Sequence, residues 1–292
     1  MRSTKAEATA IRGYTRNARP RVAAAGTLSK ESAMLLAIDI GNTNVVVGVF
    51  QGDKILTSWR LATERTRMTD EWWAILATLA ASDTVDLHAL DGTILSSVVP
   101  RLTPVFIELC RERLRREPVV VNSQLDFGIG ILIDNPTEVG ADRLANTVAA
   151  FTRHGGPAVV VDFGTGTNFD VVSERGDYIG GAIAPGLTLA LEALTSRAAR
   201  LSAVELAVPE HAIGRDTFTS VQSGTVLGYI GLIEGLLARI TQELGEKPVV
   251  IATGGLGGVI APHTDAIDTY EPDLTLHGLR IIFERVRQRS AD

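Results

Sequence analysis

The sequence predicts an α/β protein made of two similar domains with a cleft between them. An internal duplication carries this prediction, because LLAIDIGNTNVVVGVFQGDKILTSWRL and PAVVVDFGTGTNFDVVSERGDYIGGAIAPG share one strand–turn–strand–turn–strand pattern. Asp39 aligns with Asp162 and Gly41 with Gly164, 123 residues later. Helical segments follow both copies. Each copy therefore forms a sheet covered by crossover helices, and ligands collect in the cleft between such domains.

Three strands open the first domain, over 34–40, 44–50 and 54–63, with turns at Gly41-Asn42 and Gly52-Asp53. TDEWWAILATLAASD predicts a helix with Thr69 as its N-cap, since its apolar residues recur on one face. The remaining segments alternate in the same way. They are a strand in GTILSSVVP, a helix over 103–116, a strand in PVVVNS and a helix in VGADRLANTVAAFTRHG.

The second copy supplies three more strands, then a run of helices from Thr188, the strand PVVIATGG and a last helix near the C-terminus. Arg153-His154-Gly155-Gly156-Pro157 breaks the helical pattern between the copies. We therefore expect an N-terminal domain over 34–153 and a C-terminal domain over 154–292.

Residues 1–33 differ in composition from the rest of the chain. They hold seven basic residues against Glu7 and Glu31, and are rich in Ala, Ser and Thr. Such a start is compatible with a transit peptide, but it lacks a clear apolar face. We expect a disordered N-terminal extension.

Composition excludes several classes of protein. A net charge of −6 argues against a nucleic-acid surface, which needs clustered Lys and Arg. No apolar run approaches the roughly 20 residues of a membrane helix. Cys110 is the only cysteine, so no intramolecular disulfide forms. These features predict a cytoplasmic protein without nucleic-acid or membrane partners.

Two duplicated turns carry the chemistry. In Asp39-Ile40-Gly41-Asn42-Thr43-Asn44 a carboxylate ends a buried strand, where ligands of α/β proteins collect, and Gly41 lets backbone approach a phosphate. Asp162-Phe163-Gly164-Thr165-Gly166-Thr167 repeats this arrangement. A hairpin turn alone explains either segment, but two facing copies can clamp the phosphates of a nucleotide. Asp39 would hold Mg²⁺ for ATP, directly or through water.

Two further motifs complete the pattern. Thr253-Gly254-Gly255 follows a strand and allows flat contact with a base or ribose. Gly140-Ala141-Asp142-Arg143 opens a helix, whose first-turn N–H groups attract anions. Asp142 could accept a proton from an attacking hydroxyl, and Arg143 could pair with a carboxylate or phosphate. When this last motif stands alone, helix-start electrostatics with a surface salt bridge is the better explanation.

Taken together, DIGNTN, DNPTEVGADR, VVVDFGTGTNFDVV, GGAIAPG, IGRDTFTSVQSG and ATGGL resemble the type III pantothenate kinases, in the same order, from Met34 to about Arg285. The resemblance implies two duplicated actin-like ATPase (ribonuclease H-like) domains. It also implies ATP-dependent phosphorylation of pantothenate, the first step of coenzyme A synthesis. A monovalent cation, K⁺ or NH₄⁺, and a homodimer with its active site near the subunit interface belong to the same expectation.

The resemblance also assigns roles to single residues. Asp142 is the proton acceptor and Asp162 belongs to the monovalent-cation site. Contacts to ATP are assigned to Asp39, Ile40, Gly41, Asn42, Thr43, Asn44, Val45, Val46 and Thr165. Contacts to pantothenate are assigned to Ile133, Gly140, Ala141, Asp142, Arg143 and Thr217.

Four residues depart from the family's usual pattern. Ile133 replaces a substrate-contacting tyrosine, and Asp216 replaces an asparagine beside the substrate loop. Gly166 and Asn168 alter the second hairpin. The four departures together motivate one alternative hypothesis, a nucleotide-binding regulator with little or no catalysis. Ile133 alone motivates another, a kinase for a different hydroxylated acid.

Overall fold

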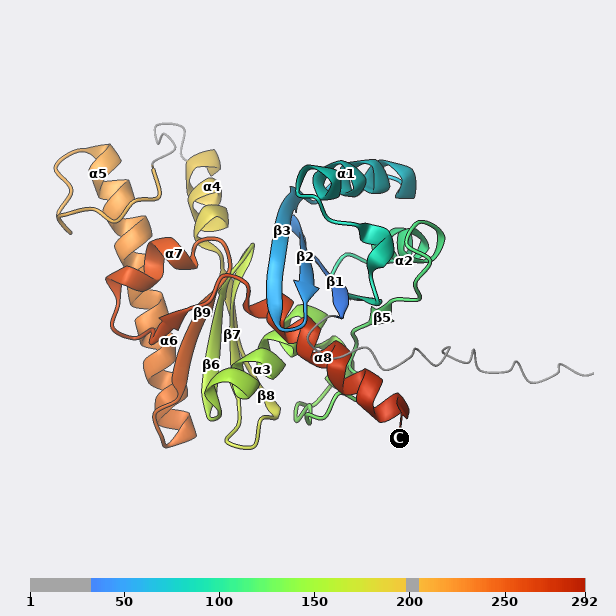
Figure 1. The fold of residues 1–292 in the computed structure, drawn as a ribbon. Coiled ribbons are helices and arrows are strands. Elements are labelled where there is room, and N and C mark those ends of the chain that lie inside the picture. Colours follow the sequence, from blue (N-terminus) through green and yellow to red (C-terminus); the bar gives the residue numbers. More distant parts are fainter. Residues whose placement is uncertain (1–32, 198–204, 292) are drawn as a thin grey trace, which may run out of the picture.

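Two five-stranded sheets form the framework of the chain in the computed structural model, which describes residues 33–197 and 205–291 (Figure 1). The first sheet has the order β3-β2-β1-β4-β5 and the second the order β8-β7-β6-β9-β10. The matching order confirms the predicted duplication and the two-domain α/β fold. Residues 1–32, which are all of the expected N-terminal extension except its last residue, lie outside the described part of the chain.

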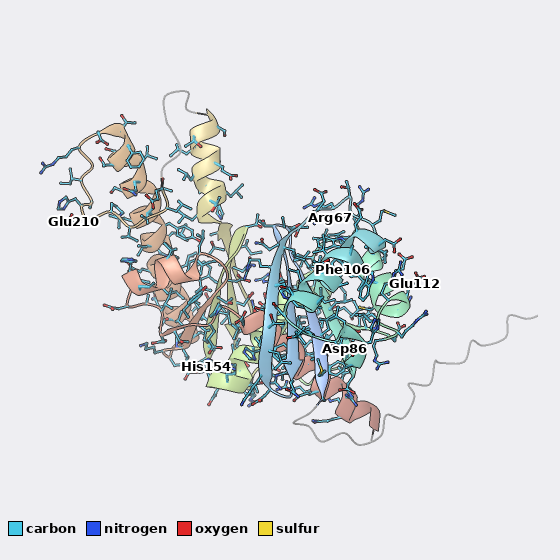
Figure 2. The ribbon with its side chains drawn as sticks, turned by 45° about the horizontal axis from the view of Figure 1, so that its top comes forward. Arg67, Asp86, Phe106, Glu112, His154 and Glu210 are labelled. Atoms are coloured by element: carbon cyan, nitrogen blue, oxygen red, sulfur yellow. The ribbon has the colours of Figure 1, made fainter. Side chains whose placement is uncertain are left out.

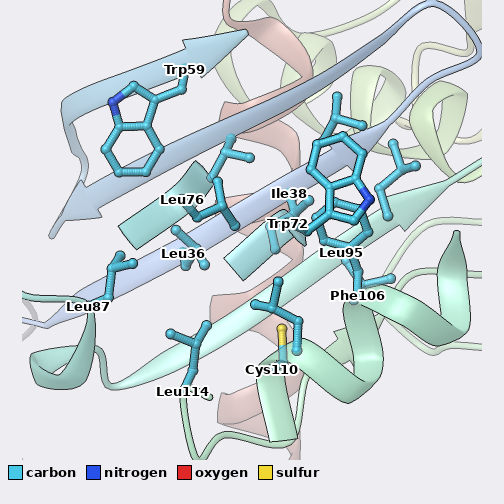
Figure 3. Close-up of a cluster of buried hydrophobic side chains, with 14 of the residues drawn as sticks. Leu36, Ile38, Trp59, Trp72, Leu76, Leu87, Leu95, Phe106, Cys110 and Leu114 are labelled. Atoms are coloured by element: carbon cyan, nitrogen blue, oxygen red, sulfur yellow. The ribbon is translucent and has the colours of Figure 1, made fainter. Parts of the chain in front are cut away.

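The first sheet is built on the buried strand β1 (Met34–Ile40), which pairs antiparallel with β2 and parallel with β4. Its other strands are β2 (Asn44–Gln51), β3 (Lys54–Ala62), β4 (Gly92–Ser97) and β5 (Val119–Val120). Helices α1 (Thr69–Ser82) and α2 (Thr103–Glu112) cover one face. In Figure 3, Trp72 packs on Phe106 with ring centroids 5.0 Å apart, beside Leu76 and Cys110.

The second sheet repeats this pairing around β6 (Ala158–Phe163). Its other strands are β7 (Gly166–Val172), β8 (Tyr178–Pro185), β9 (Val249–Thr253) and β10 (Thr269–Tyr270). The helices of this half are α4 (Leu187–Arg197), α5 (Thr217–Gln222), the π-helical turn η3 (Ser223–Leu227), α6 (Gly228–Leu244) and α7 (Gly257–Ile260). Buried residues of α6 form a core with β6, β7 and β9.

Two helices lie between the sheets and connect them. Helix α3 (Ala141–His154) contacts β6 and β7, whereas α8 (Leu274–Ala291) packs on β1, β2 and β4 of the other half. The helices cross so closely that a Cβ added at Gly278 would collide with the carbonyl oxygen of Ala145. In Figure 2, His154 lies in the C-terminal half, and its Nε2 is 2.5 Å from Oε1 of Glu271. The two halves thus exchange helices, so α8 packs outside the sheet of its own half.

The predicted N-cap of α1 was wrong by one residue. The helix begins at Thr69, and Met68 occupies the N-cap position in an extended conformation. Glu71 accepts a hydrogen bond from the Met68 N–H at 2.8 Å. The hydroxyl of Thr69 is unavailable as a cap because it donates to Oε2 of Glu108 on α2, at 2.5 Å.

One continuous helical run in the described part of the chain, Thr217–Leu244, reaches the length and hydropathy of a membrane span. Buried Tyr229, Ile233 and Leu237 on this run pack into the C-terminal core. Length and composition alone therefore do not distinguish it from a core helix.

Candidate active site

The two predicted hairpins meet where strands β1 and β6 end. Gly41 N–H donates to the carbonyl of Asn44 at 2.9 Å, and Gly164 N–H donates to that of Gly166 at 3.0 Å. The hydroxyls of Thr43 and Thr165 are 2.6 Å apart, so the tips of the hairpins touch across the cleft. Polar groups from both copies of the duplication are thereby directed at one space, which suits a ligand with several anionic oxygens.

A single cavity between the sheets is lined by most of the residues predicted to bind ATP. The predicted residues that line it are Asp39, Gly41, Asn42, Thr43, Asn44, Val46, Asp142, Asp162 and Thr165. Gly254 and Gly255 of the third motif also border it. Four elements far apart in the sequence therefore supply one site.

Partly buried carboxylates dominate the electrostatics of this cavity. Burial raises the pKa of Asp39 to about 8, and the negative charge of Asp142 adds to the effect. The same two causes raise the pKa of Asp162 to about 6. Burial also raises the pKa of Asp142. Each shift shows that this site destabilises negative charge in the absence of a cation.

The carboxylates fit a bound Mg²⁺ by their chemistry. Mg²⁺ takes oxygen ligands and is usually held by one or two carboxylates together with substrate phosphates. Asp39 and Asp162 supply such oxygens beside the hairpins. Across the described residues, no group of three or more His, Cys, Asp and Glu side chains is arranged to hold a metal without other ligands.

Asp142 is fixed at the start of α3, on the wall of the cavity. Its Oδ1 accepts a hydrogen bond from the Arg143 N–H at 2.8 Å. Gly140 makes room for this carboxylate, because a Cβ at Gly140 would collide with Oδ1 of Asp142. Gly254 has the same relationship to Asp162, whose Oδ1 would lie 2.6 Å from an added Cβ. A side chain at Gly140 would therefore displace the carboxylate of Asp142, whereas Gly254 is also required by its φ of +83° and by the Phe163 backbone, 2.7 Å from an added Cβ.

Arg143 is turned toward the second sheet, where it pairs with a residue that the sequence did not single out. Its Nε donates to Oδ1 of Asp170 at 2.5 Å, and its guanidinium lies 5.5 Å from the ring centroid of Tyr178. Asp170 is fully buried. Burial raises the pKa of Asp170 to about 7, against the lowering effect of the Arg143 charge. No separate motif marks Asp170, because it lies mid-strand on β7.

Several predicted residues do not line the cavity. Ile40 and Val45 are fully buried in the core of the first sheet, so only their backbone could serve a ligand. Gly140 and Ala141 stand at the start of α3. Ile133 lies near Gly180, where an added Cβ would be 3.7 Å from its side chain. The cavity lining includes none of these residues.

Thr217 lies far from the hairpins, at the start of α5 (Figure 1). It borders a second, open pocket with Leu194 and Arg215. Asp216 caps this helix, since its Oδ1 accepts from the Thr219 N–H at 2.7 Å and from the Thr219 hydroxyl at 2.8 Å. The carboxylate of Asp216 therefore serves as the N-cap of α5.

The cavity also contains residues that sequence reasoning missed, including Arg60, Asp273 and Thr275. Arg60 lies on β3, opposite Val46 of β2. Asp273 and Thr275 flank the start of α8. Strand register places Arg60 at the cavity, and the packing of α8 on the first sheet places Asp273 and Thr275 there. No sequence motif indicates either of these arrangements.

Two duplicated sheets, each with a hairpin at the end of its central strand that faces one shared cavity, define the actin-like ATPase fold. Solved structures show the same fold at low identity. A Campylobacter jejuni protein described as a Baf family transcriptional activator matches with a TM-score of 0.57 and 19% identity, over 87% of this chain and 99% of that one. The Clostridium difficile activator of 2-hydroxyisocaproyl-CoA dehydratase, with bound ADPNP, matches with a TM-score of 0.53 and 10% identity, over 89% and 98%.

Sequence comparison identifies the family within this class. The family model for type III pantothenate kinase matches residues 35–239. A type III pantothenate kinase of Thermomicrobium roseum is 54% identical over 87% of this chain and 98% of its own length. One from Moorella thermoacetica is 48% identical over 86% and 99%. The chain belongs to the type III pantothenate kinase family.

Proposed function

We propose that this protein transfers the γ-phosphoryl group of ATP to pantothenate, giving 4'-phosphopantothenate and ADP in the first step of coenzyme A synthesis. The observation that carries the proposal is the placement of Asp142 in the same cavity as both phosphate hairpins. A proton acceptor and a phosphate clamp are the parts that phosphoryl transfer to an alcohol needs, because positioning and charge neutralisation dominate this chemistry.

In the proposed reaction the primary hydroxyl of pantothenate attacks the γ-phosphorus. A new O–P bond forms, the bond from the γ-phosphorus to the β–γ bridging oxygen breaks, and ADP leaves with that oxygen. Asp142 accepts the hydroxyl proton at its carboxylate. The raised pKa of Asp142 suits this role, since a base of higher pKa holds the proton more readily.

The hairpin residues Asn42, Thr43, Asn44 and Thr165 would donate hydrogen bonds to the nucleotide phosphates. Asp39 would hold Mg²⁺, which supplies charge neutralisation on the phosphates when it is bound. Asp162 would take part in a K⁺ or NH₄⁺ site. The same observation supports both cations. A bound cation would stabilise the charged form of these two partly buried carboxylates and so lower their raised pKa values.

Arg143 would bind the carboxylate of pantothenate. Its Nε is occupied by Asp170, and no other hydrogen bond joins its guanidinium to the described residues. Its two Nη atoms therefore remain available for an anion. Gly140, Ala141 and Ile133 would line the acceptor, with Ile133 offering an apolar contact in place of a hydroxyl.

We also propose a homodimer. Large apolar side chains are exposed near α4 and α5, including Ile213, which is 84% exposed, and Phe218, which is 47% exposed. A second copy covering this face would bury them. Because Thr217 lies on the same face, it would reach a substrate only at such an interface. A cytoplasmic location without nucleic-acid or membrane partners remains part of the proposal.

The test is an ADP-release assay with ATP and pantothenate, supplied with K⁺, NH₄⁺ or Na⁺ as the only monovalent cation, together with mass detection of phosphopantothenate. The proposal predicts pantothenate-dependent turnover that requires K⁺ or NH₄⁺. Folded protein that binds ATP but gives no product with any cation would favour the regulator hypothesis. A higher kcat/KM for another hydroxylated acid would favour the third hypothesis.

A further inference from the structure

The cavity holds several carboxylates but little positive charge. Arg60 is the only Lys or Arg among the described residues that line it, whereas Asp39, Asp142, Asp162 and Asp273 all do so. Arg60 is exposed and makes no ion pair within the described part of the chain. A free guanidinium at the wall of an acidic cavity is available for an anionic ligand.

Strand register places Arg60 in line with Asp39. Asp39 pairs with Val46, and Val46 pairs with Arg60, so the three residues form one row across β1, β2 and β3. Laterally paired residues project from the same face of a sheet. Two strand spacings separate Arg60 from Asp39, about 10 Å at the backbone, and a long side chain bridges much of that distance.

The charge of Arg60 acts on carboxylates from both halves of the molecule. It opposes the effect of burial at Asp39, in its own sheet, and at Asp162, in the other sheet. Arg60 also lines the cavity that both hairpins border, so its side chain adjoins the space between them. This is the space in which the phosphates of a nucleotide would lie.

The duplication shows that the fold itself does not require this cation. In the second sheet the corresponding row runs from Asp162 through Asn168 to Ile183. Ile183, the counterpart of Arg60, is 69% exposed. The same place in the same architecture thus carries an apolar residue in one copy and a guanidinium in the other.

We propose that Arg60 is a catalytic residue that contacts the transferred phosphoryl group and stabilises the charge of its transition state. This inference rests on the proposed phosphoryl transfer. As the O–P bond to the acceptor forms and the bond to the β–γ bridging oxygen breaks, the equatorial oxygens stay anionic between the two hairpins. Arg60 reaches them from β3, while Asp142 takes the acceptor proton and Arg143 is held beside Asp170.

The test compares Arg60→Gln and Arg60→Lys with the matched control Arg175→Gln. Arg175 is an exposed arginine in the turn between β7 and β8, at the end of these strands remote from the hairpin of Gly164–Gly166. Because Arg60 is exposed on an edge strand, its substitution should leave folding intact. We expect Arg60→Gln to lower kcat by roughly 10²–10³-fold, with a partial recovery in Arg60→Lys and no change in Arg175→Gln.

Binding of ADP with aluminium fluoride, a mimic of the transferring phosphoryl group, tests Arg60 without the acceptor. We expect the wild type to bind this complex more tightly than ADP, and Arg60→Gln to bind both equally. An unchanged kcat, an unchanged preference for the fluoride complex, or a rise in the KM of pantothenate alone would each overturn the role of Arg60. A wild type that prefers the fluoride complex but shows no pantothenate-dependent turnover would overturn the proposed acceptor and leave the role of Arg60 supported.

Discussion

The buried carboxylate of Asp170 holds the guanidinium of Arg143, with Oδ1 and Nε 2.5 Å apart. The side chain of Asp170 is fully buried and that of Arg143 is 15% exposed. Oδ2 of Asp170 has no hydrogen-bond partner in the described part of the chain. Since an isolated buried charge is costly, the pair is kept together and fixes the direction of Arg143 beside Asp142 at the start of α3.

Asp170→Asn should impair acceptor binding through Arg143. Without the carboxylate charge, the guanidinium of Arg143 is no longer held in place. We therefore expect the KM of pantothenate to rise by about tenfold or more and the KM of ATP to change little. Stability should also fall, because the partly buried guanidinium of Arg143 loses its hydrogen-bonded partner. Steady-state kinetics and chemical denaturation measure the two effects.

A double-mutant cycle separates this role from a structural one. If Asp170 acts through Arg143, then Asp170→Asn should add little to the pantothenate KM in an Arg143→Gln background. Additive effects on KM would show that Asp170 influences binding by another route.

Gly140→Ala should displace the proposed base without disturbing the helix. Gly140 has φ −64° and ψ 145°, a conformation that alanine adopts readily, but the added Cβ would collide with Oδ1 of Asp142. We expect kcat to fall by roughly 10²-fold, with nucleotide affinity and melting temperature close to wild type. A variant with full kcat would show that the position of Asp142 is not critical.

Asp39 should contribute less to the stability of the metal-free, nucleotide-free protein as pH rises. Asp39 has an ordinary pKa of 3.8 when unfolded and about 8 in the folded protein, so the folded state binds more protons between these values. The free energy of unfolding therefore falls with pH across this window. Asp39→Asn removes this contribution, and we expect its melting temperature to exceed that of wild type by more at pH 8 than at pH 5. A constant difference between the two proteins would contradict the proposed effect of desolvation on the pKa of Asp39.

Two helical glycines provide a matched test of the close packing of α3 against α8. Gly278 on α8 lies against the backbone of Ala145, whereas Gly231 on α6 has open space around it. Gly278→Ala should destabilise the protein by about 1–3 kcal/mol, because α3 and α8 must separate. Gly231→Ala should stabilise it by about 0.5–1 kcal/mol through helix propensity. Equal effects in denaturant titrations would argue against a tight α3–α8 crossing.

Sequence patterns predicted the fold and the main elements of the site, since their signals are local. A buried apolar strand that ends in Asp-x-Gly, repeated 123 residues later, is visible without a structure. It specifies two sheets, two hairpins and a shared cleft. Asp142 was singled out by its place in the family resemblance, because a carboxylate at a helix start is by itself explained by helix electrostatics.

Residues positioned by long-range packing could not be predicted. Arg60 faces the cavity only because β3 pairs with β2 in one register, past a shift at Val49–Phe50. The pairing of Asp170 with Arg143 depends on the packing of α3 against β7. Thr69 looked like a helix cap, but its hydroxyl bonds Glu108 on another helix. In each case tertiary contacts, which no local pattern encodes, decided the outcome.

The most direct test of the central claim is the turnover of Asp142→Asn with ATP and pantothenate, measured beside its affinity for ADP. Asparagine preserves the shape of the side chain but cannot accept the hydroxyl proton. We predict that kcat falls by roughly 10²–10⁴-fold while ADP affinity stays at the wild-type value. Turnover at the wild-type rate would contradict the assignment of Asp142 as the base and, with it, the proposed mechanism.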